Sequence, residues 1–227
     1  MQPLLSIIIP VLNEAEQLPA KLLALQSLRE QCELVLVDGG SADGSENIAL
    51  AYVDKVLTSP PGRAKQMNTG AAQANADIFL FLHADTQLPA GAAGLILQAV
   101  QRGYHWGRFD VQFDSRQTLF RIIAFMMNLR SRLTGIATGD QALFMTRQAF
   151  QTVNGFADIA LMEDIAISTA LKKLGRPYCF TEQVVTSARR WRQYGVLNTI
   201  FLMWYLRLAY FFGADPSVLA SRYRRRS

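Results

Sequence analysis

Hydrophobic and polar positions follow a regular pattern through the first half of the chain. Short, nearly continuous apolar runs predict strands over residues 5–11, 33–37, 54–58 and 78–82. Between them, apolar residues at helical spacing predict helices over residues 14–30, 45–52 and 64–75. Buried strands separated by helices are typical of a parallel sheet that is covered on both faces. The pattern therefore predicts an α/β fold.

The second half of the chain has a different pattern. It predicts strands over residues 106–113 and 142–146 and helices over residues 119–133 and 164–174. Residues 196–212 are strongly apolar and helical, but the run is short for a membrane span and is interrupted by Asn198 and Arg207. Two interpretations of this helix stay open. It packs on the rest of the domain, or it lies against a membrane or a partner.

Composition narrows the class of protein. The chain has 227 residues, of which 50% are hydrophobic and 18% are charged. This length favours one domain with a sizeable core, and the composition excludes a disordered chain, a collagen-like repeat and a disulfide scaffold. Cys32 and Cys179 lie far apart in the sequence, which excludes a zinc ribbon and a Cys-x-x-Cys redox motif. They are expected to be reduced thiols in a cytoplasmic protein.

Positive charge is concentrated at the C-terminal end. From Ser187 onward there are eight arginines and one acid, Asp215, so this segment carries +7 against a net +5, which leaves −2 for the rest. A nucleic-acid binder usually spreads basic residues over its main domain, so no nucleic-acid partner is expected. The basic segment suits a diphosphate, an anionic membrane surface, or both. The apolar N-terminus lacks a basic leader and is cut short by Pro10, which predicts a buried strand rather than a signal peptide or membrane span.

Polar residues follow the predicted strands where ligands of such sheets bind, beyond the carboxyl ends. Asn13 and Glu14 follow the first strand, Asp38 ends the second, and His83 and Asp85 close the fourth. A carboxylate in the position of Asp85 is well placed to hold Mg²⁺ or Mn²⁺, which take one or two protein oxygens and complete their shell with phosphate and water. Taken alone, Asp85 is equally consistent with a polar loop residue.

Loop motifs add candidates and exclude two nucleotide-binding folds. The segment 38–45 joins a strand to a helix, but Ser45 stands where a Walker loop needs lysine, and no Gly-x-Gly-x-x-Gly occurs. Arg63, Lys65, Gln66 and Asn68 follow a Pro-Pro-Gly turn, and such residues either bind a nucleotide and its phosphates or simply begin a solvated helix.

Two further motifs lie in the second half. Glu163 and Asp164 begin a predicted helix. Acids are common at this position because they interact favourably with the helix dipole, and the functional alternative is that one of them is a general base. Arg189, Arg190 and Trp191 combine guanidinium groups that can grip a diphosphate with an indole that can stack on a sugar or base. The alternative is a basic surface loop.

In their order, these motifs resemble glycosyltransferase family 2. The resemblance rests on Ser-Ile-Ile-Ile-Pro-Val-Leu-Asn-Glu (6–14), Val-Asp-Gly-Gly-Ser-Ala-Asp-Gly-Ser (37–45), Gly-Arg-Ala-Lys-Gln-Met-Asn (62–68), Leu-His-Ala-Asp (82–85), Glu-Asp (163–164) and Ala-Arg-Arg-Trp (188–191). It implies a GT-A fold, in which a Rossmann-like, nucleotide-binding mixed sheet is flanked by helices, here with a helical C-terminal extension. Residues 1–195 are then expected to form the catalytic domain, with a nucleotide-sugar half near 1–100, an acceptor half near 101–195, and an apolar helix plus basic tail over 196–227.

The resemblance also implies roles for single residues. Asp164, with Glu163 beside it, matches the catalytic base motif, and Asp85 matches the last residue of the metal-binding Asp-x-Asp motif. His83 replaces the first Asp of that motif, and a neutral imidazole adds no negative charge. Asp38 would accept a hydrogen bond from the base of the nucleotide, which is most often uracil. The residues expected around the nucleotide sugar are Pro10, Leu12, Asn13, Glu14, Asp38, Gly39, Arg63, Lys65, Asn68, His83, Ala84, Arg189, Arg190 and Trp191.

The function implied is an inverting, metal-assisted transfer of a sugar from a nucleotide-diphosphate sugar, expected to be UDP-linked, to an acceptor hydroxyl. Ser187 replaces the Gln of the family's Gln-x-x-Arg-Trp element, and the small size and Arg-Arg-Trp end resemble a bacterial subgroup of arsenosugar-biosynthesis glycosyltransferases. A cytoplasmic location is expected, with contact between residues 196–227 and the cytoplasmic face of a membrane as one hypothesis. Two alternatives are a non-catalytic nucleotide-sugar binder docked at a membrane and a nucleotidyltransferase. The acidic Asn-Glu-Ala-Glu after the first strand disfavours the latter.

Overall fold

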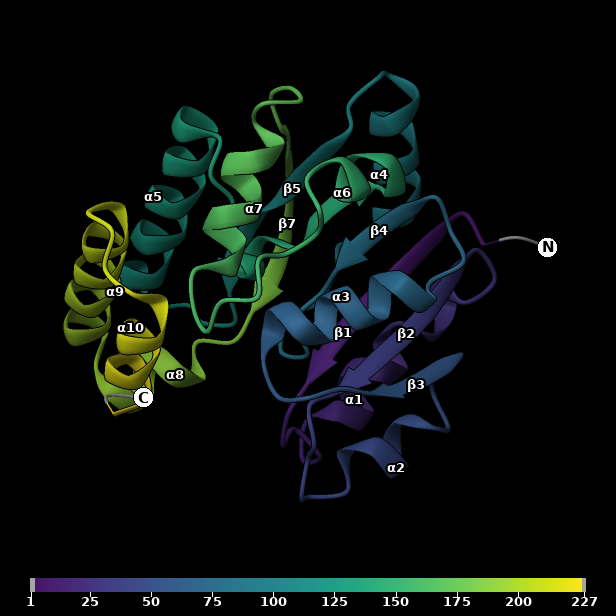
Figure 1. The fold of residues 1–227 in the computed structure, drawn as a ribbon. Helices are drawn as coiled ribbons and strands as arrows, with labels where there is room; N and C mark the ends of the chain where they lie inside the picture. The colour runs from purple at the N-terminus through teal and green to yellow at the C-terminus, as the bar shows by residue number, and fades with distance from the viewer. Residues whose placement is uncertain (1–2, 226–227) are drawn as a thin grey trace.

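The fold is taken from a computed structural model that describes residues 3–225, so the ends of the chain, residues 1–2 and the last part of the predicted basic tail at 226–227, lie outside the description (Figure 1). The strands are β1 (Leu5–Val11), β2 (Cys32–Asp38), β3 (Lys55–Thr58), β4 (Ile78–Phe81), β5 (Trp106–Phe113), β6 (Leu143–Thr146) and β7 (Tyr178–Thr186). The helices are α1 (Leu18–Ala24), α2 (Ser45–Ala49), α3 (Arg63–Gln73), α4 (Ala92–Gln101), α5 (Thr118–Thr134), α6 (Arg147–Thr152), α7 (Glu163–Leu171), α8 (Arg189–Tyr194), α9 (Val196–Phe211) and α10 (Pro216–Arg225), with short 3-10 turns η1 (Gln26–Leu28) and η2 (Gly139–Gln141).

All of these strands form one mixed sheet in the order β3-β2-β1-β4-β6-β5-β7. Strand β6 is antiparallel to both of its neighbours, β4 and β5, whereas the pairs β1–β2, β1–β4, β2–β3 and β5–β7 are parallel. Every strand except β6 therefore runs in the same direction, and their carboxyl ends lie along one edge of the sheet. The prediction of an α/β fold with a mixed sheet is confirmed.

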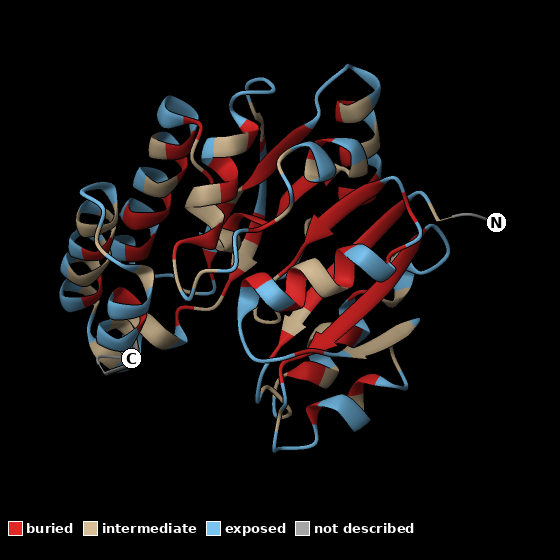
Figure 2. Cartoon of the chain, in the orientation of Figure 1, coloured by how far each residue is buried: buried red, intermediate tan, exposed pale blue. Residues whose placement is uncertain are grey.

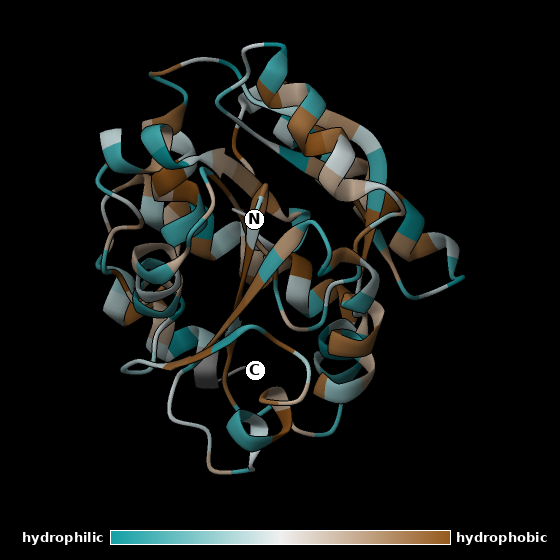
Figure 3. Ribbon diagram, turned by 90° about the vertical axis from the view of Figure 1, so that its right-hand side faces the viewer, coloured by the Kyte–Doolittle hydropathy of each residue, from teal (hydrophilic) through white to brown (hydrophobic). Residues whose placement is uncertain are grey.

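Helices cover both faces of the sheet, because successive apolar side chains of a strand point to opposite sides. Ile7 and Ile9 of β1 belong to a core under α1, α4 and α5, whereas Ile8 belongs to a second core under α3, α6 and α7. The central strands are buried almost throughout (Figure 2). In the view turned by 90°, the hydrophobic strands run through the middle of the molecule with helices on either side (Figure 3).

The direction of the strands brings distant loops together. The loops that follow β1, β2, β4, β5 and β7 all leave the carboxyl edge of the sheet, and η2 enters antiparallel β6 at the same edge. Apolar, buried strands thus carry the polar motifs 12–14, 38–45, 82–85 and 187–191 to one place. This is the edge at which parallel α/β sheets bind ligands.

Several elements differ from the sequence prediction. The helix predicted over residues 14–30 is divided into α1 and η1, and Pro19 lies in the first turn of α1, where proline is tolerated because that N–H is unpaired in any helix. Helices α4, α6 and α10 and strand β7 were not predicted. The motif Arg-Arg-Trp lies on α8 rather than in a loop.

Helices α9 and α10 pack as a hairpin on the segment that leads into α7. Leu206 of α9 and Leu219 of α10 are buried against Met162, the residue just before Glu163. The packing interpretation of the apolar C-terminal helix is thus confirmed for one of its faces. The opposite face of α9 is apolar and exposed, with relative accessibilities of 66% at Phe201, 65% at Trp204 and 81% at Phe211.

Among residues 3–225, no helix is both long and apolar enough to cross a membrane.

Candidate active site

Two adjoining cavities open at the carboxyl edge of the sheet. The first, of about 370 Å³, lies over the ends of β1 and β4 and the start of α3. The second, of about 150 Å³, lies between η2, the start of α7 and the helices α8 and α9. Both cavities are lined by Arg63, His83, Asp85, Leu161, Glu163, Arg190 and Tyr223. Because they share this wall, a ligand that fills the first cavity reaches the second.

Most of the residues expected from the motifs lie around these cavities. The first cavity is lined by Pro10, Leu12, Glu14, Arg63, His83, Ala84, Asp85, Glu163 and Arg190. Asp164 and Trp191 line the second cavity. Asp85 and Asp164, which are 79 positions apart in the chain, therefore face the same enclosed space.

The loops after β1 and β2 are joined to each other by hydrogen bonds. The Asn13 amide oxygen accepts from the Ala42 N–H at 2.9 Å, and the Asn13 N–H donates to the Ser41 hydroxyl at 2.8 Å. The Glu14 N–H donates to the Ser45 hydroxyl at 3.0 Å. Asn13 has φ = 54°, a left-handed conformation that Asn tolerates better than most residues. The side chain of Asn13 therefore serves the loop, and it shapes the cavity wall indirectly.

Asp38 ends β2 with only one of its carboxylate oxygens in use. Its Oδ2 accepts from the N–H groups of Gly40 and Ser41, at 2.8 and 2.7 Å, and this holds the glycine-rich turn in place. Its Oδ1 is buried and has no hydrogen-bond partner among the described residues. A buried oxygen without a donor is costly unless a ligand supplies one.

Gln66, one of the polar residues that follow the Pro-Pro-Gly turn, fixes the floor of the first cavity. Its side-chain amide donates to the carbonyls of Val11 and Val37, at 2.7 and 2.8 Å, and so ties together the ends of β1 and β2. The same side chain packs against Gly39, where a Cβ would approach it to 3.1 Å. Gly39 thus allows the turn to approach α3 closely.

His83 lies against the η2 turn. Its Nδ1 is 3.4 Å from the Asp140 carboxylate, and its Nε2 lies so close to Gly139 that a Cβ at that position would clash with it. Burial alone would raise the pKa of Asp140, but the hydrogen bond and charge of His83, together with Arg63 and Arg207, lower it. Asp140 is a site residue that the sequence motifs did not reveal.

Asp85 has the oxygen chemistry that a divalent cation requires. One of its oxygens accepts from the Thr86 hydroxyl at 3.2 Å, and its side chain lines both cavities. Within residues 3–225 there is no group of three or more His, Cys, Asp or Glu side chains that could hold a metal by themselves. Mg²⁺ and Mn²⁺ do not need such a group, because one or two carboxylates plus substrate phosphates suffice. The residues therefore fit a cation that binds together with a diphosphate.

The Glu163-Asp164 pair is rigidly held at the start of α7. The Asp164 carboxylate accepts from the Gly139 N–H at 3.0 Å through Oδ2 and from the Ile165 N–H at 2.8 Å through Oδ1. Met162, directly before the pair, has φ = 73°, a strained conformation for a side chain of this size, and its packing against α9 and α10 holds it there. The C-terminal hairpin thus supports the Glu163-Asp164 pair.

Charged neighbours tune two groups in the shared wall. Burial, and then the adjacent Asp164, raise the pKa of Glu163, although Arg63 opposes this shift. Burial would lower the pKa of Arg63, but Glu163, Tyr223, Asp140 and Asp85 together raise it. A charged guanidinium beside a carboxyl that resists ionisation makes this wall receptive to an added anion such as a diphosphate.

Helices α8 and α10, from the C-terminal segment of the chain, form one wall of the site. Arg190 lines both cavities, and its guanidinium stacks on the Tyr223 ring at 3.9 Å from the ring centroid. Trp191 packs edge-on against Phe113. Arg189 is half-exposed and lies 3.4 Å from Glu14, so it bridges α8 to the loop after β1. Tyr223 was not predicted as a site residue.

Six of the expected nucleotide-sugar residues line neither cavity: Asn13, Asp38, Gly39, Lys65, Asn68 and Arg189. Lys65 is largely exposed and is 3.8 Å from Asp158. The Asn68 side chain donates to the Phe156 carbonyl at 2.8 Å and accepts from the Phe156 N–H at 2.9 Å. Its amide is thus used to hold a loop. No direct contact of Asn68 with a nucleotide follows from this arrangement.

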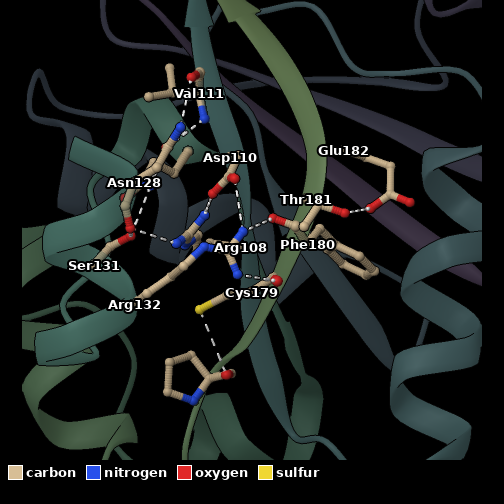
Figure 4. A network of polar contacts seen from close by, with 12 residues as sticks. Arg108, Asp110, Val111, Asn128, Ser131, Arg132, Cys179, Phe180, Thr181 and Glu182 are labelled. Atoms are coloured by element: carbon tan, nitrogen blue, oxygen red, sulfur yellow. Dashed lines mark hydrogen bonds and ion pairs between the residues drawn. The ribbon is translucent and has the colours of Figure 1, made fainter. Parts of the chain in front are cut away.

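A larger groove of about 680 Å³ lies elsewhere, between α5 and the strands β5 and β7. It contains none of the residues expected from the motifs. Near it, Asp110 is paired with both Arg108 and Arg132, and Arg132 also donates to the carbonyls of Cys179 and Phe180 (Figure 4). One carboxylate joins two guanidiniums, and both arginines also donate to backbone carbonyls, so the network has the character of a structural brace.

Comparisons with known proteins agree with this geometry. Residues 6–153 match the family model described as glycosyl transferase family 2. Undecaprenyl-phosphate 4-deoxy-4-formamido-L-arabinose transferases from Photorhabdus laumondii subsp. laumondii and Serratia proteamaculans are 30% and 31% identical over 153 residues. These matches cover 60% of the chain and 46% and 45% of the relatives, so the chain spans less than half of their length.

Solved structures share the fold. A mannosyltransferase from Pyrobaculum calidifontis, solved with GDP-Man and Mn²⁺, has a TM-score of 0.64 at 21% identity, and the match covers 86% of the chain and 61% of that protein. TarS of S. aureus, solved with UDP-GlcNAc, has a TM-score of 0.63 at 14% identity, over 82% of the chain and 58% of TarS. At these identities the likeness shows the GT-A fold.

Proposed function

The chain belongs to glycosyl transferase family 2, and within this family we propose that it moves a sugar, with inversion, from a UDP-linked donor to an acceptor hydroxyl. The observation that carries the proposal is the common cavity of Asp85, Arg190 and Asp164. A leaving diphosphate and an attacking acceptor must lie on opposite sides of the anomeric carbon for inversion. One enclosed space bordered by a cation-binding acid, an arginine and a separate acid suits this arrangement.

Donor binding is assigned to the half of the domain near residues 1–100 and acceptor binding to the half near 101–195, with residues 196–225 completing the wall. The free, buried Oδ1 of Asp38 supports base recognition, because the N3–H of uracil is a donor that this oxygen lacks. The glycine turn beside it leaves room for a planar base. Pro10, Leu12 and Glu14 would then line the ribose and the start of the diphosphate.

Mg²⁺ or Mn²⁺ is proposed as the cofactor. Asp85 would hold it, and it would supply positive charge against the diphosphate as that group leaves. His83 is committed to Asp140 and Gly139, so its contribution is to position the η2 turn. Arg190, stacked on Tyr223, and Arg63 provide fixed positive charge on the same wall, which stabilises the developing negative charge of the leaving group.

Asp164 is proposed as the general base. Two backbone N–H groups fix its carboxylate without using all of its lone pairs, so an acceptor hydroxyl can still donate to it. It would remove the hydroxyl proton as the oxygen attacks the anomeric carbon from the side opposite the diphosphate. Glu163, whose pKa is raised by burial and by Asp164, would form the wall beside it.

Contact with the cytoplasmic face of a membrane is part of the proposal. The exposed apolar face of α9 carries Phe201, Trp204 and Phe211. Neither α9 nor α10 contains an acidic residue, and both contain arginine. An apolar face flanked by basic residues suits an anionic lipid surface. The named relatives are undecaprenyl-phosphate transferases, which is compatible with an acceptor at a membrane.

The proposal is tested with purified protein, Mn²⁺ and a panel of UDP- and GDP-sugars, with release of the nucleoside diphosphate as the readout. Release that depends on Mn²⁺ and that is lost in Asp85→Ala supports a metal-assisted transferase. Calorimetric binding of a nucleotide sugar with no turnover would instead support the non-catalytic binder. Release of inorganic diphosphate from a nucleoside triphosphate would support a nucleotidyltransferase.

A further inference from the structure

Four arginines lie around α5 and the second cavity, and they fall into two kinds. Arg108 and Arg132 are paired with Asp110, as Figure 4 shows. The side chains of Arg130 on α5 and Arg207 on α9 have no hydrogen bond or ion pair to any residue in the described part of the chain. The Nε and Nη2 atoms of Arg130 are moreover fully enclosed.

The two unpaired guanidiniums lie close enough to repel each other. Burial, and then the charge of Arg207, lower the pKa of Arg130 to about 10, and burial also lowers the pKa of Arg207. Asp164 and Asp140 attract both arginines, but in the described part of the chain neither carboxylate forms an ion pair or hydrogen bond with them. Asp164 accepts from two backbone N–H groups, and Asp140 contacts His83. Both guanidiniums therefore lack a direct anionic partner beside the proposed base.

Unpaired, partly enclosed arginines are costly to a fold, and such groups concentrate at functional sites. Arg207 is also the only charged residue in the sixteen residues of α9, and its side chain lines the second cavity together with Asp164. It does not line the first cavity, where Arg63 and Arg190 meet the proposed donor. Arg207 thus faces the acceptor side of the site, and Arg130, which lines neither cavity, lies close to Arg207 and to Asp164.

We propose that Arg130 and Arg207 form a binding site for the phosphate group of a phosphorylated acceptor, next to Asp164. Each guanidinium presents several N–H donors in a planar fork, which matches phosphate oxygens, and two of them neutralise a dianion. The inference rests on the proposed transferase function and names its acceptor class. A lipid phosphate and a soluble phosphate ester share this chemistry, and the experiment separates them.

The test is calorimetric binding of farnesyl phosphate and of glycerol 3-phosphate to the full chain, with farnesol and glycerol as phosphate-free controls. Arg207→Gln and Arg130→Gln are compared with the wild type. Arg121→Gln, at an exposed position on the same helix as Arg130, is the matched control. UDP binding with Mn²⁺ is measured on all variants, because it reports on the donor side alone.

We expect at least one phosphate ester to bind, and each of the two variants to weaken it by about tenfold or more, the loss typical of one charge-assisted hydrogen bond. UDP binding and the Arg121→Gln variant should match the wild type. The tighter of the two esters identifies a lipid or a soluble acceptor. The proposal would be overturned if farnesol bound with the same affinity as farnesyl phosphate. It would also be overturned if the two variants weakened the binding of UDP but not the binding of the phosphate ester.

A melting experiment covers the case in which a binding variant is misfolded. Arg130→Met replaces the unpaired charge with an apolar chain of similar length, so it should melt at or above the wild-type temperature while losing stabilisation by the ester. A lower melting temperature would assign Arg130 a structural role and contradict the proposal. If UDP fails to bind the wild type while the ester binds, the donor assignment fails and the phosphate site stands.

Discussion

Replacement of Asp164 by Asn tests the proposed base with little change in shape. Asn keeps one side-chain oxygen, so one of the two backbone bonds, from Gly139 at 3.0 Å or from Ile165 at 2.8 Å, is retained. The other N–H meets an amide NH₂, and the loss is about 1 kcal/mol of stability, which for a domain of this size lowers Tm by about 2–4 °C. The fold should therefore survive the change.

The catalytic loss should be much larger than the structural one. General-base assistance is worth about 10²- to 10⁴-fold in rate, which is about 3–5 kcal/mol of barrier. We expect kcat of Asp164→Asn to fall by that factor while calorimetric UDP binding with Mn²⁺ is unchanged. Asp158→Asn, an exposed acid of the same loop region, is the control and should keep full activity. A folded Asp164→Asn enzyme with kcat within a few-fold of wild type would refute the assignment.

Three further predictions follow from single features of the structure. Asp38→Asn should weaken UDP binding about 10- to 100-fold by calorimetry, because the free Oδ1 loses its charge; an unchanged Kd would contradict base recognition there. Glu163→Gln should raise Tm at neutral pH, because a carboxyl whose pKa is raised in the folded protein costs stability above its ordinary pKa of 4.5. The difference should vanish as the pH falls below 4.5, where the carboxyl is protonated in both the folded and the unfolded chain; a pH-independent difference would count against the shift. Serine at Phe201, Trp204 and Phe211 should reduce flotation with anionic liposomes at unchanged Tm, and equal flotation would remove α9 from membrane contact.

Much of the fold could be predicted because its central strands have strong local signals. The buried strand β1 and the strand β5 have the predicted limits. Strand β7 was missed because its sequence mixes Thr, Glu and Gln with apolar residues, and its pairing with β5 depends on tertiary contact. Helix α10 was missed because it is polar and arginine-rich overall.

The site shows the same division between local and tertiary information. Motif residues such as Asp85 and Asp164 could be found because each has a short local pattern. Asp140 and Tyr223 could not, because their roles arise only where separate elements meet. Arg207 gave a usable signal: a single charge in an otherwise apolar helix marks a functional position, although the sequence analysis used it only to argue against a membrane span.

The most direct test of the central claim is a crystal structure of the protein with Mn²⁺ and an intact UDP-sugar. We predict the base at Asp38, the diphosphate between Asp85 and Arg190, and the anomeric carbon exposed toward Asp164 on the side away from the diphosphate. A donor bound in the groove between α5 and β5, or one whose diphosphate lies between its anomeric carbon and Asp164, would contradict the account.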